Sequence, residues 1–253
     1  MDVAKYEFEQ DFVEILAIGD IHLGSEMSSF DQVLKVIEEE RDSKLIFMGD
    51  LIDNAIINSL GDIYSQKQNP HEAIVKIRKL FKKYKNRILG VVGGNHERRT
   101  WRRVGIDPLS LICTEVNIPY SDDVLIIDVA IKGKRGRGMK NRTHYSIACH
   151  HGASGGRFPE RSSRQQRYFH SFISGVDIYI TGHTHVPDIL KLAIHEYDSR
   201  NKVISKKETY HITIPAWSDE KYARQKMLQP TANGLIKIKL FNGYKKNIKV
   251  VMR

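Results

Sequence analysis

Five short segments of the chain place side chains that can bind a metal ion beside glycine. They are Gly19-Asp20-Ile21-His22, Gly49-Asp50, Gly94-Asn95-His96-Glu97, Cys149-His150-His151-Gly152 and Gly182-His183-Thr184-His185. A single Gly-Asp pair is usually a turn, and a lone His-x-His pair is as often a surface feature. Five such segments together favour a metal site. A ligand set of carboxylates, imidazoles and one amide, without thiolates, suits Mn²⁺, iron or Zn²⁺ rather than a structural zinc.

These side chains supply enough donors for two ions, with Asp50 as the natural bridge between them. Two divalent cations about 3.5–4 Å apart bind a phosphoryl group, stabilise its developing charge and lower the pKa of a water between them. The sequence therefore predicts hydrolysis of a phosphate ester. A non-enzymatic binding scaffold with a vestigial site is the rival hypothesis. It predicts missing ligands or a missing acid, whereas every expected group is present.

The metal-binding segments each follow an apolar run that predicts a strand. In the first half, strands are expected at 13–18, 45–48 and 88–92, separated by helical patterns at 30–40 and 71–85. This β–α–β–α–β order predicts a parallel sheet with covering helices. Loops at the ends of parallel strands converge on one edge of the sheet, so their side chains can meet in space.

The second half of the chain has a different pattern. Strands are expected at 124–131, 144–149 and 177–181, a helix near 162–173, and two hairpins formed by 188–197 with 203–214 and by 234–241 with 245–251. This pattern favours a mixed two-sheet α/β sandwich over a single doubly wound sheet. The chain shows no internal repeat and no linker, so we expect one domain spanning residues 1–253.

Length and composition are those of a globular protein, with 253 residues and a net charge of +10. The first twelve residues carry acids and no apolar run, and no stretch is long enough to cross a bilayer. Cys113 and Cys149 lie in apolar contexts and are expected to be reduced core residues. We therefore expect a cytoplasmic protein without a membrane segment. No oligomeric state follows from the sequence.

The ordered set of metal-binding segments resembles the calcineurin-like metallophosphoesterase family over residues 19–185. That family includes phosphoprotein phosphatases, cyclic-nucleotide phosphodiesterases and a repair nuclease. The resemblance implies an α/β fold, a four-layer α/β/β/α sandwich of two mixed β-sheets flanked by helices. It also implies two divalent metal ions, with Mn²⁺ favoured and iron or Zn²⁺ as alternatives, and hydrolysis by water activated between them.

The resemblance also assigns residue roles. One metal would be held by Asp20, His22, Asp50 and His185. The other would be held by Asp50, Asn95, one histidine of the 150/151 pair and His183. His96 would donate a proton to the leaving oxygen, and Asp53 would orient His96.

The pair His150 and His151 leaves two candidates for one ligand, because neighbouring strand side chains point to opposite faces. The segment from His151 to Arg157 resembles an H-G-x-x-G-G-[RK] stretch of phage-type members, whose histidine is the ligand. This favours His151 and places His150 in the core or behind the ligands. Residues 215–217 and 221–223 also resemble phage and prophage members.

Asn54 departs from the phosphoprotein phosphatases, which have a phosphate-gripping arginine at that position. Four arginines at 98, 99, 102 and 103 follow the His96 segment directly. We expect Arg98, Arg99 and Arg157 to contact the substrate phosphate. The alternative is that the arginines after His96 form the solvated start of a helix.

The excess of lysine and arginine over aspartate and glutamate indicates which substrates the chain attracts. The segment 132–142 contains six basic residues and no acid. Such segments can follow a nucleic-acid backbone, although a solvated hairpin tip is an equal alternative. The leading hypothesis is a nuclease-like phosphodiesterase acting on DNA or RNA. The alternatives are a small-molecule or cyclic-nucleotide phosphodiesterase or phosphomonoesterase, followed by a Ser/Thr phosphoprotein phosphatase.

Overall fold

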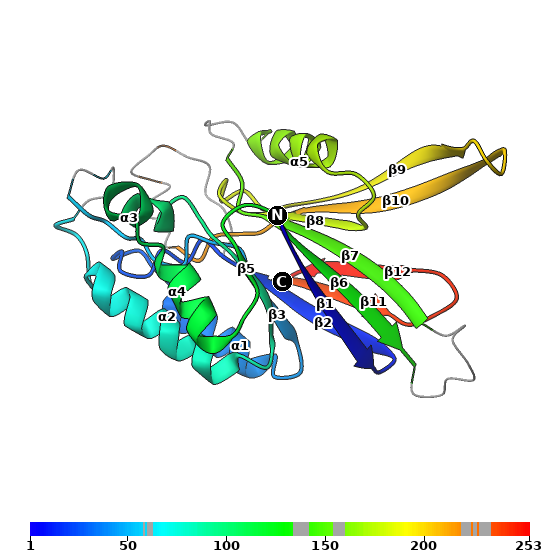
Figure 1. Ribbon diagram of the computed structural model, residues 1–253. Helices are drawn as coiled ribbons and strands as arrows, with labels where there is room; N and C mark the ends of the chain where they lie inside the picture. Colours follow the sequence, from blue (N-terminus) through cyan, green and yellow to red (C-terminus); the bar gives the residue numbers. More distant parts are fainter. Residues whose placement is uncertain are drawn as a thin grey trace.

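Two mixed β-sheets, each of six strands, pack face to face with helices on both outer sides (Figure 1). The computed structural model describes residues 1–57, 59, 63–133, 142–153, 160–218, 224, 227 and 234–253. The strand orders are β12-β11-β2-β3-β4-β5 and β1-β6-β7-β8-β10-β9. The predicted four-layer α/β/β/α sandwich is confirmed.

The first sheet is built around three parallel strands, β2 (Phe12–Ile18), β3 (Lys44–Phe47) and β4 (Ile88–Val92). Helices α1 (Phe30–Glu39) and α2 (Pro70–Tyr84) connect them. The edges are formed by β5 (Tyr120–Ser121) beside β4, and by antiparallel β11 (Ile236–Phe241) and β12 (Asn247–Met252) beside β2. The predicted β–α–β–α–β run is thus present, and the antiparallel strands make the sheet mixed.

The second sheet joins parallel and antiparallel strands from both halves of the chain. Its members are β1 (Asp2–Glu9), β6 (Leu125–Lys132), β7 (Arg142–His150), β8 (Ile178–Thr181), β9 (Asp188–Asp198) and β10 (Val203–Thr213). Strands β7, β8 and β10 run parallel to one another, whereas β6 and β9 run antiparallel to their neighbours β7 and β10. Helix α5 (Arg161–Phe172) covers the outer face of this sheet (Figure 1).

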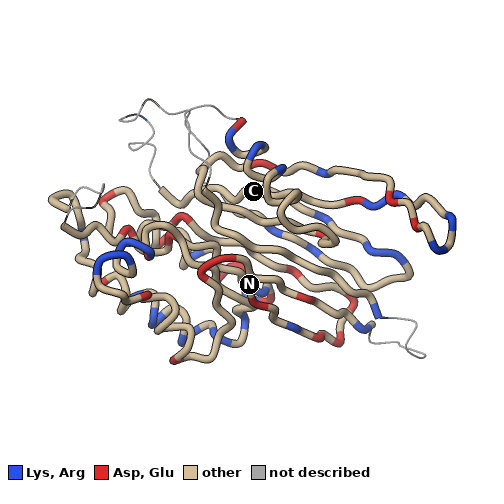
Figure 2. The backbone as a smooth tube through the Cα atoms, turned by 45° about the horizontal axis from the view of Figure 1, so that its top comes forward, with Lys and Arg blue, Asp and Glu red and all other residues tan. Residues whose placement is uncertain are grey.

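The hairpin of β9 and β10 extends beyond the body of the sandwich (Figure 1). Both signs of charge occur along it (Figure 2), including Asp198, Arg200 and Lys202 around its turn. Most of β9 is solvent-exposed. In the described ranges, no helix is long and apolar enough to cross a membrane.

The central strands bury side chains on both faces. Ile15 and Ala17 of β2 contribute to the core between the sheets, whereas Leu16 and Ile18 pack toward the helices. Burial of one side chain of Leu or Ile size contributes about 1.5–3 kcal/mol. Because these strands are packed against helices on one face and against the second sheet on the other, the loops at their ends start from fixed positions.

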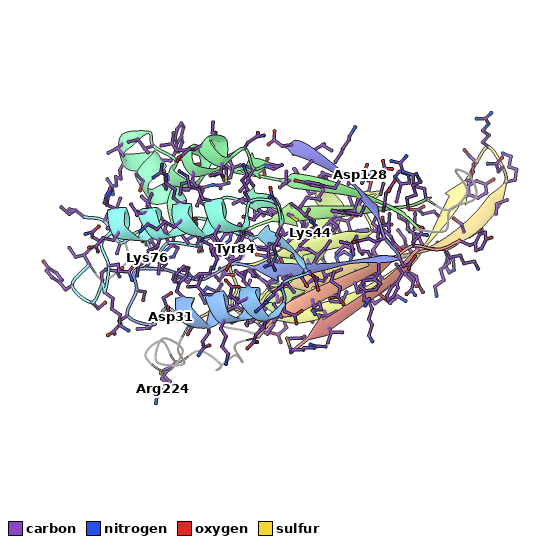
Figure 3. The ribbon with its side chains drawn as sticks, turned by 90° about the horizontal axis from the view of Figure 1, so that it is seen from below. Asp31, Lys44, Lys76, Tyr84, Asp128 and Arg224 are labelled. Carbon is purple, nitrogen blue, oxygen red and sulfur yellow. The ribbon has the colours of Figure 1, made fainter. Side chains whose placement is uncertain are left out.

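Local signals in the sequence define helix α2. Asn69 and Glu72 form a reciprocal capping box, and Pro70 occupies the first turn, where no backbone donor is needed. At its other end, the Tyr84 hydroxyl donates to Glu38 of α1. This contact ties together the two helices that lie side by side in Figure 3.

Three elements have no counterpart in the sequence prediction: β1, β5 and α4 (Pro108–Val116). Helix α3 (Glu97–Val104) corresponds to the helix start that was the alternative interpretation of the arginines after His96. Strand β1 pairs in parallel with β6, and only Ala4 in it is buried. Cys113 and Cys149 are buried free thiols, as the sequence predicts. Arg157, residues 134–141 of the basic segment and residues 221–223 lie outside the described residues.

Candidate metal centre

The five metal-binding segments lie at the carboxyl ends of β2, β3, β4, β7 and β8. Backbone hydrogen bonds join the loops that follow these strands. The Asp20 N–H donates to Gly49 O (3.0 Å), and the His22 N–H donates to Asp50 O (2.9 Å). In the other sheet, the Gly182 N–H donates to His151 O (2.8 Å). Each loop is therefore held by its neighbour as well as by its own strand.

One cluster of ligand atoms comes from Asp20, His22 and His185, whose donor atoms lie within 4.8 Å of one another. Nε2 of His185 is 3.2 Å from Nε2 of His22 and 3.5 Å from Oδ1 of Asp20. Burial raises the pKa of Asp20, but the hydrogen bond and charge of His185 outweigh it and lower the pKa. The Asp20 carboxylate is thus ionised and faces two imidazoles.

His22 in this cluster is neutral. Burial and then the charge of His96 lower its pKa to about 3. Its Nδ1 is buried without a hydrogen-bond partner among the described residues, and lies 3.7 Å from Asp53 Oδ1. A buried neutral imidazole is the form that binds metal ions.

The second cluster comes from Asp50, His151 and His183, again with donor atoms within 4.8 Å. Nε2 of His151 lies 3.2 Å from Asp50 Oδ2 and 3.1 Å from Asn95 Oδ1. Nδ1 of His151 donates to the Met48 carbonyl (2.7 Å), which leaves Nε2 facing the other ligands. Burial lowers the pKa of His151, but Asp50 outweighs it and raises the pKa to about 10, so this position favours positive charge.

Asp50 lies between the two clusters and is 2% exposed. Its Oδ2 is 3.2 Å from His151 Nε2 and 3.7 Å from His96 Nε2, and its donor atoms also group with those of His22. Asp50 thus shares a group of ligand atoms with one member of the first cluster and with both other members of the second. The anionic carboxylates, neutral imidazole and convergent Nε2 atoms fit two divalent cations.

The loops that carry the ligands adopt a backbone conformation that is rare for side chains other than glycine. Positive φ angles occur at Asp20 (49°), His22 (49°), Asp50 (49°), His183 (68°) and His185 (58°). Each such residue costs about 1–3 kcal/mol and clusters of them occur at functional sites. The backbone conformation that brings these side chains together therefore costs folding free energy. The backbone hydrogen bonds between the loops help to offset this cost.

Glu97 is a positioning residue to which the sequence analysis gave no role. Its Oε1 accepts from the N–H groups of Leu51 (2.8 Å) and Ile52 (3.1 Å), and its Oε2 accepts from those of Asp50 and Gly94 (both 3.0 Å). Burial and the Asp50 charge raise the pKa of Glu97 to about 7. Four N–H donors leave no site for a proton, so we infer that the carboxylate is ionised and ties the two loops together.

Gly94 is required where these loops meet. A Cβ atom there would lie 2.1 Å from Oδ1 of Asp50 and 2.7 Å from Oε2 of Glu97. The absence of a side chain allows the Asn95 loop to approach the Asp50 carboxylate.

His96 borders the clusters and is held on its outer side. Its Nδ1 donates to the Asp53 carbonyl (2.7 Å) and lies 3.2 Å from Asp53 Oδ1. The Gln66 amide donates to the other Asp53 oxygen (2.8 Å). His96 Nε2 points inward, toward Asp50.

Arg99 is the arginine that reaches His96. Its Nη1 donates to the Asp53 carbonyl (2.8 Å), and its Nη2 lies 3.0 Å from His96 Nε2. Arg98 is half-buried on α3. The pKa of His150 is lowered mainly by burial, and the charge of Arg98 adds to this effect. Four arginines make α3 a basic helix (Figure 2).

Asn54 supports the backbone of this region. Its amide donates to the His96 carbonyl and to Thr100 Oγ1, both at 2.7 Å. The sequence resemblance aligned Asn54 with a phosphate-gripping arginine of phosphoprotein phosphatases. In this chain, Asn54 instead holds helix α3 in place.

His150 faces away from both clusters. Its Nδ1 accepts from the Gly152 N–H (2.8 Å), and its Nε2 lies 3.8 Å from Asp123 Oδ1. The ring packs against Phe169, with 5.8 Å between centroids. The structure thus brings His151, and not its neighbour, to Asp50 and Asn95.

The sequence profile of the calcineurin-like phosphoesterases matches residues 13–187, well over half of the chain and the whole span of the candidate ligands. The chain belongs to this family. It is therefore a metal-dependent hydrolase of phosphate esters, as the sequence predicts, and members of the family typically bind two divalent metals. The comparison with curated proteins finds no match.

Solved structures similar to this phosphoesterase include YfcE, a phosphoesterase from E. coli, at 14% identity and a TM-score of 0.45, covering 94% of this chain and 98% of that one. The calcineurin-like phosphoesterase YfkN from Bacillus subtilis has 12% identity and a TM-score of 0.40, covering 96% and 91%. GAP50, described as the anchor in the inner membrane complex of Plasmodium, has 10% identity and a TM-score of 0.46, covering 96% and 84%. Similarity at this level does not identify a substrate.

Proposed function

We propose that this phosphoesterase cleaves phosphodiester bonds in DNA or RNA with the help of two divalent cations. One cation would be held by Asp20, His22, Asp50 and His185, and the other by Asp50, Asn95, His151 and His183. The two-cation part of this proposal is supported by the pair of ligand clusters, which Asp50 joins through its groupings with His22 and with His151. The substrate part is supported by the basic helix α3. Mn²⁺ is the expected metal, with iron and Zn²⁺ as alternatives.

His96 is the proposed proton donor to the leaving oxygen. When bound, the two cations would polarise the phosphate and activate the attacking water. His96 Nδ1 donates to the Asp53 carbonyl, and Nε2 accepts from Arg99 Nη2 at 3.0 Å. Nε2 would therefore hold the transferable proton once Arg99 turns to the substrate phosphate. Burial lowers the pKa of His96, but the charge of Asp50 and the hydrogen bond of Asp53 outweigh it and raise the pKa. Asp53 would thus both orient His96 and favour its acidic form.

The four arginines of helix α3 favour a polyanionic substrate. Arg98 and Arg99 lie next to the proposed acid and would contact the phosphate, with Arg157 as a further proposed contact. Arg102 is exposed on the same helix, and Trp101 there is 58% exposed. Arginine and an exposed indole are the groups with which proteins bind the backbone and bases of single strands. The net charge of +10 would add a salt-dependent attraction to nucleic acid.

We further propose that the enzyme is a cytoplasmic, single-domain protein of the phage type. The buried free thiols Cys113 and Cys149 agree with a reducing compartment. The stretch of residues 151–157 supports the phage-type relation.

The substrate is tested with end-labelled single- and double-stranded DNA and RNA, beside an aryl phosphodiester reporter, in the presence of Mn²⁺. We expect cleavage of nucleic acid that weakens steeply with salt, while hydrolysis of the reporter changes little. The variant Arg98→Ser/Arg102→Ser should lower the salt slope of binding by about 2. Lys76→Ser/Lys79→Ser on the exposed face of α2 is the matched control. Turnover of the reporter without cleavage of nucleic acid would instead indicate small phosphoesters or phosphoproteins.

A further inference from the structure

Helix α5 presents polar side chains to the sheet that it covers. Ser162, Gln165 and Gln166 are 1%, 6% and 1% exposed, alongside the apolar Phe169. Ser162 and Gln166 donate to Thr213 Oγ1 at 2.7 and 2.8 Å. A helix on a sheet normally buries an apolar stripe, so two buried glutamines on one turn require a reason.

The Gln165 amide joins two loops that carry proposed ligands. Its Oε1 accepts from the Ala153 N–H (3.1 Å), two residues after His151. Its Nε2 donates to the Gly182 carbonyl (3.0 Å), one residue before His183. Both histidines belong to the cluster that contains Asp50. One side chain on α5 therefore spans the two loops whose separation sets the distance between these imidazoles.

Gly152 makes room for this amide. Its φ angle is +112°, and a Cβ atom there would lie 2.5 Å from Gln165 Oε1 and 2.6 Å from Gln165 Nε2. The chain after His151 therefore turns in a conformation that glycine favours, directly against the amide.

We propose that Gln165 is a positioning residue for the metal site of His151 and His183, an inference that rests on the proposed ligand assignment. The amide bonds to backbone groups within two residues of each histidine and would act through the position of the two loops. Loss of such an outer partner typically weakens metal affinity by about 10–100-fold. The other proposed site, with Asp20, His22, Asp50 and His185, takes only His185 from the two loops that Gln165 joins and should be weakened less.

Calorimetric and EPR titrations of Mn²⁺ into the metal-free protein test this proposal. In Gln165→Leu, we expect one of two Mn²⁺ sites to weaken about 10–100-fold and the other by less than about threefold. Gln166→Leu is the matched control, because it removes an equally buried amide that bonds to Thr213 instead. It should retain both affinities. Gln165→Met, which keeps the length of the side chain, provides a second variant if leucine prevents folding.

Equal weakening of both sites, unchanged affinities, or the same selective loss in Gln166→Leu would overturn the role of Gln165. Wild-type protein that binds fewer than two Mn²⁺ ions would overturn the ligand assignment and this inference with it. The readout is binding, so a failure to cleave nucleic acid would count against the proposed substrate and leave the role of Gln165 standing.

Discussion

Nε2 of His151 lies 3.2 Å from Oδ2 of Asp50, although these residues are 101 positions apart in the chain and belong to different sheets. The adjacent imidazole of His150 points instead toward Asp123. The candidate site is thus assembled across the two sheets, and at the end of β7 the alternation of strand side chains brings His151 rather than His150 to it.

The two adjacent histidines should respond differently to substitution. We predict that His151→Ala lowers Mn²⁺ affinity and hydrolysis of an aryl phosphodiester by a hundredfold or more, because it removes a direct ligand. His150→Ala should change Mn²⁺ affinity and hydrolysis by less than about tenfold, which is the lower limit for residues that hold a ligand in place. The measurement is a metal titration paired with steady-state kinetics. Equal losses in the two variants would contradict the assignment.

Glu97 should matter for stability even without metal. In Glu97→Gln the new NH₂ group would face backbone N–H groups, so we predict a loss of about 3 kcal/mol in the free energy of unfolding. Urea unfolding of metal-free protein at pH 8 measures this loss. Glu115→Gln, an exposed carboxylate paired with Arg78, is the control and should have little effect. If Glu97→Gln is as stable as wild type, the carboxyl is protonated in the fold and our inference of four N–H bonds to a carboxylate is wrong.

His211 should make the fold weaker in mild acid. It is fully buried, and burial followed by the charge of His170 lowers its pKa from the usual 6.5 to about 4. Between these values the unfolded chain binds a proton that the folded chain does not, so stability falls as pH drops from 6.5 to about 4. His211→Gln should flatten this dependence in urea unfolding of metal-free protein. Parallel pH profiles for variant and wild type would show that another group is responsible.

His96 should matter most when the leaving group is poor. An alkoxide needs a proton more than an aryl oxide does, so His96→Ala should lower kcat by about 10²–10⁴-fold for alkyl esters and less for aryl esters. Asp53→Asn should show the same trend with smaller losses, because the Asp53 carbonyl still accepts from His96 Nδ1. A series of esters with graded leaving groups provides the measurement. A loss that is independent of the leaving group would assign another role to His96.

Much of the fold was predictable because the central strands are continuous apolar runs that end in glycine and a metal-binding residue. Residues 88–92 are buried throughout and are followed by Gly93, Gly94 and Asn95. Strand β1 was not predicted, because it lies at an edge and its alternating residues Val3, Lys5 and Glu7 face solvent. Helix α4 has a local signal, an Asp107 cap followed by Pro108, that the sequence analysis did not use.

The residues that support the ligands were harder to find. Glu97 stands in a motif, but three of its four partners are backbone N–H groups of the loop after β3, and such contacts have no sequence signature. Gln165 contacts residues 153 and 182, and neither contact follows from spacing or periodicity. Sequence patterns locate side chains at strand ends, whereas contacts between loops depend on the packed sheets.

We propose that two divalent cations would share Asp50 as a ligand and together perform the hydrolysis. EPR of protein loaded with two equivalents of Mn²⁺ tests it most directly, in wild type and in Asp50→Asn. We expect a spin-coupled Mn²⁺ pair in the wild type, and loss of both the coupling and phosphodiesterase activity in the variant. Uncoupled ions in the wild type, or an Asp50→Asn variant that keeps its activity, would rule out Asp50 as the shared ligand of a catalytic pair.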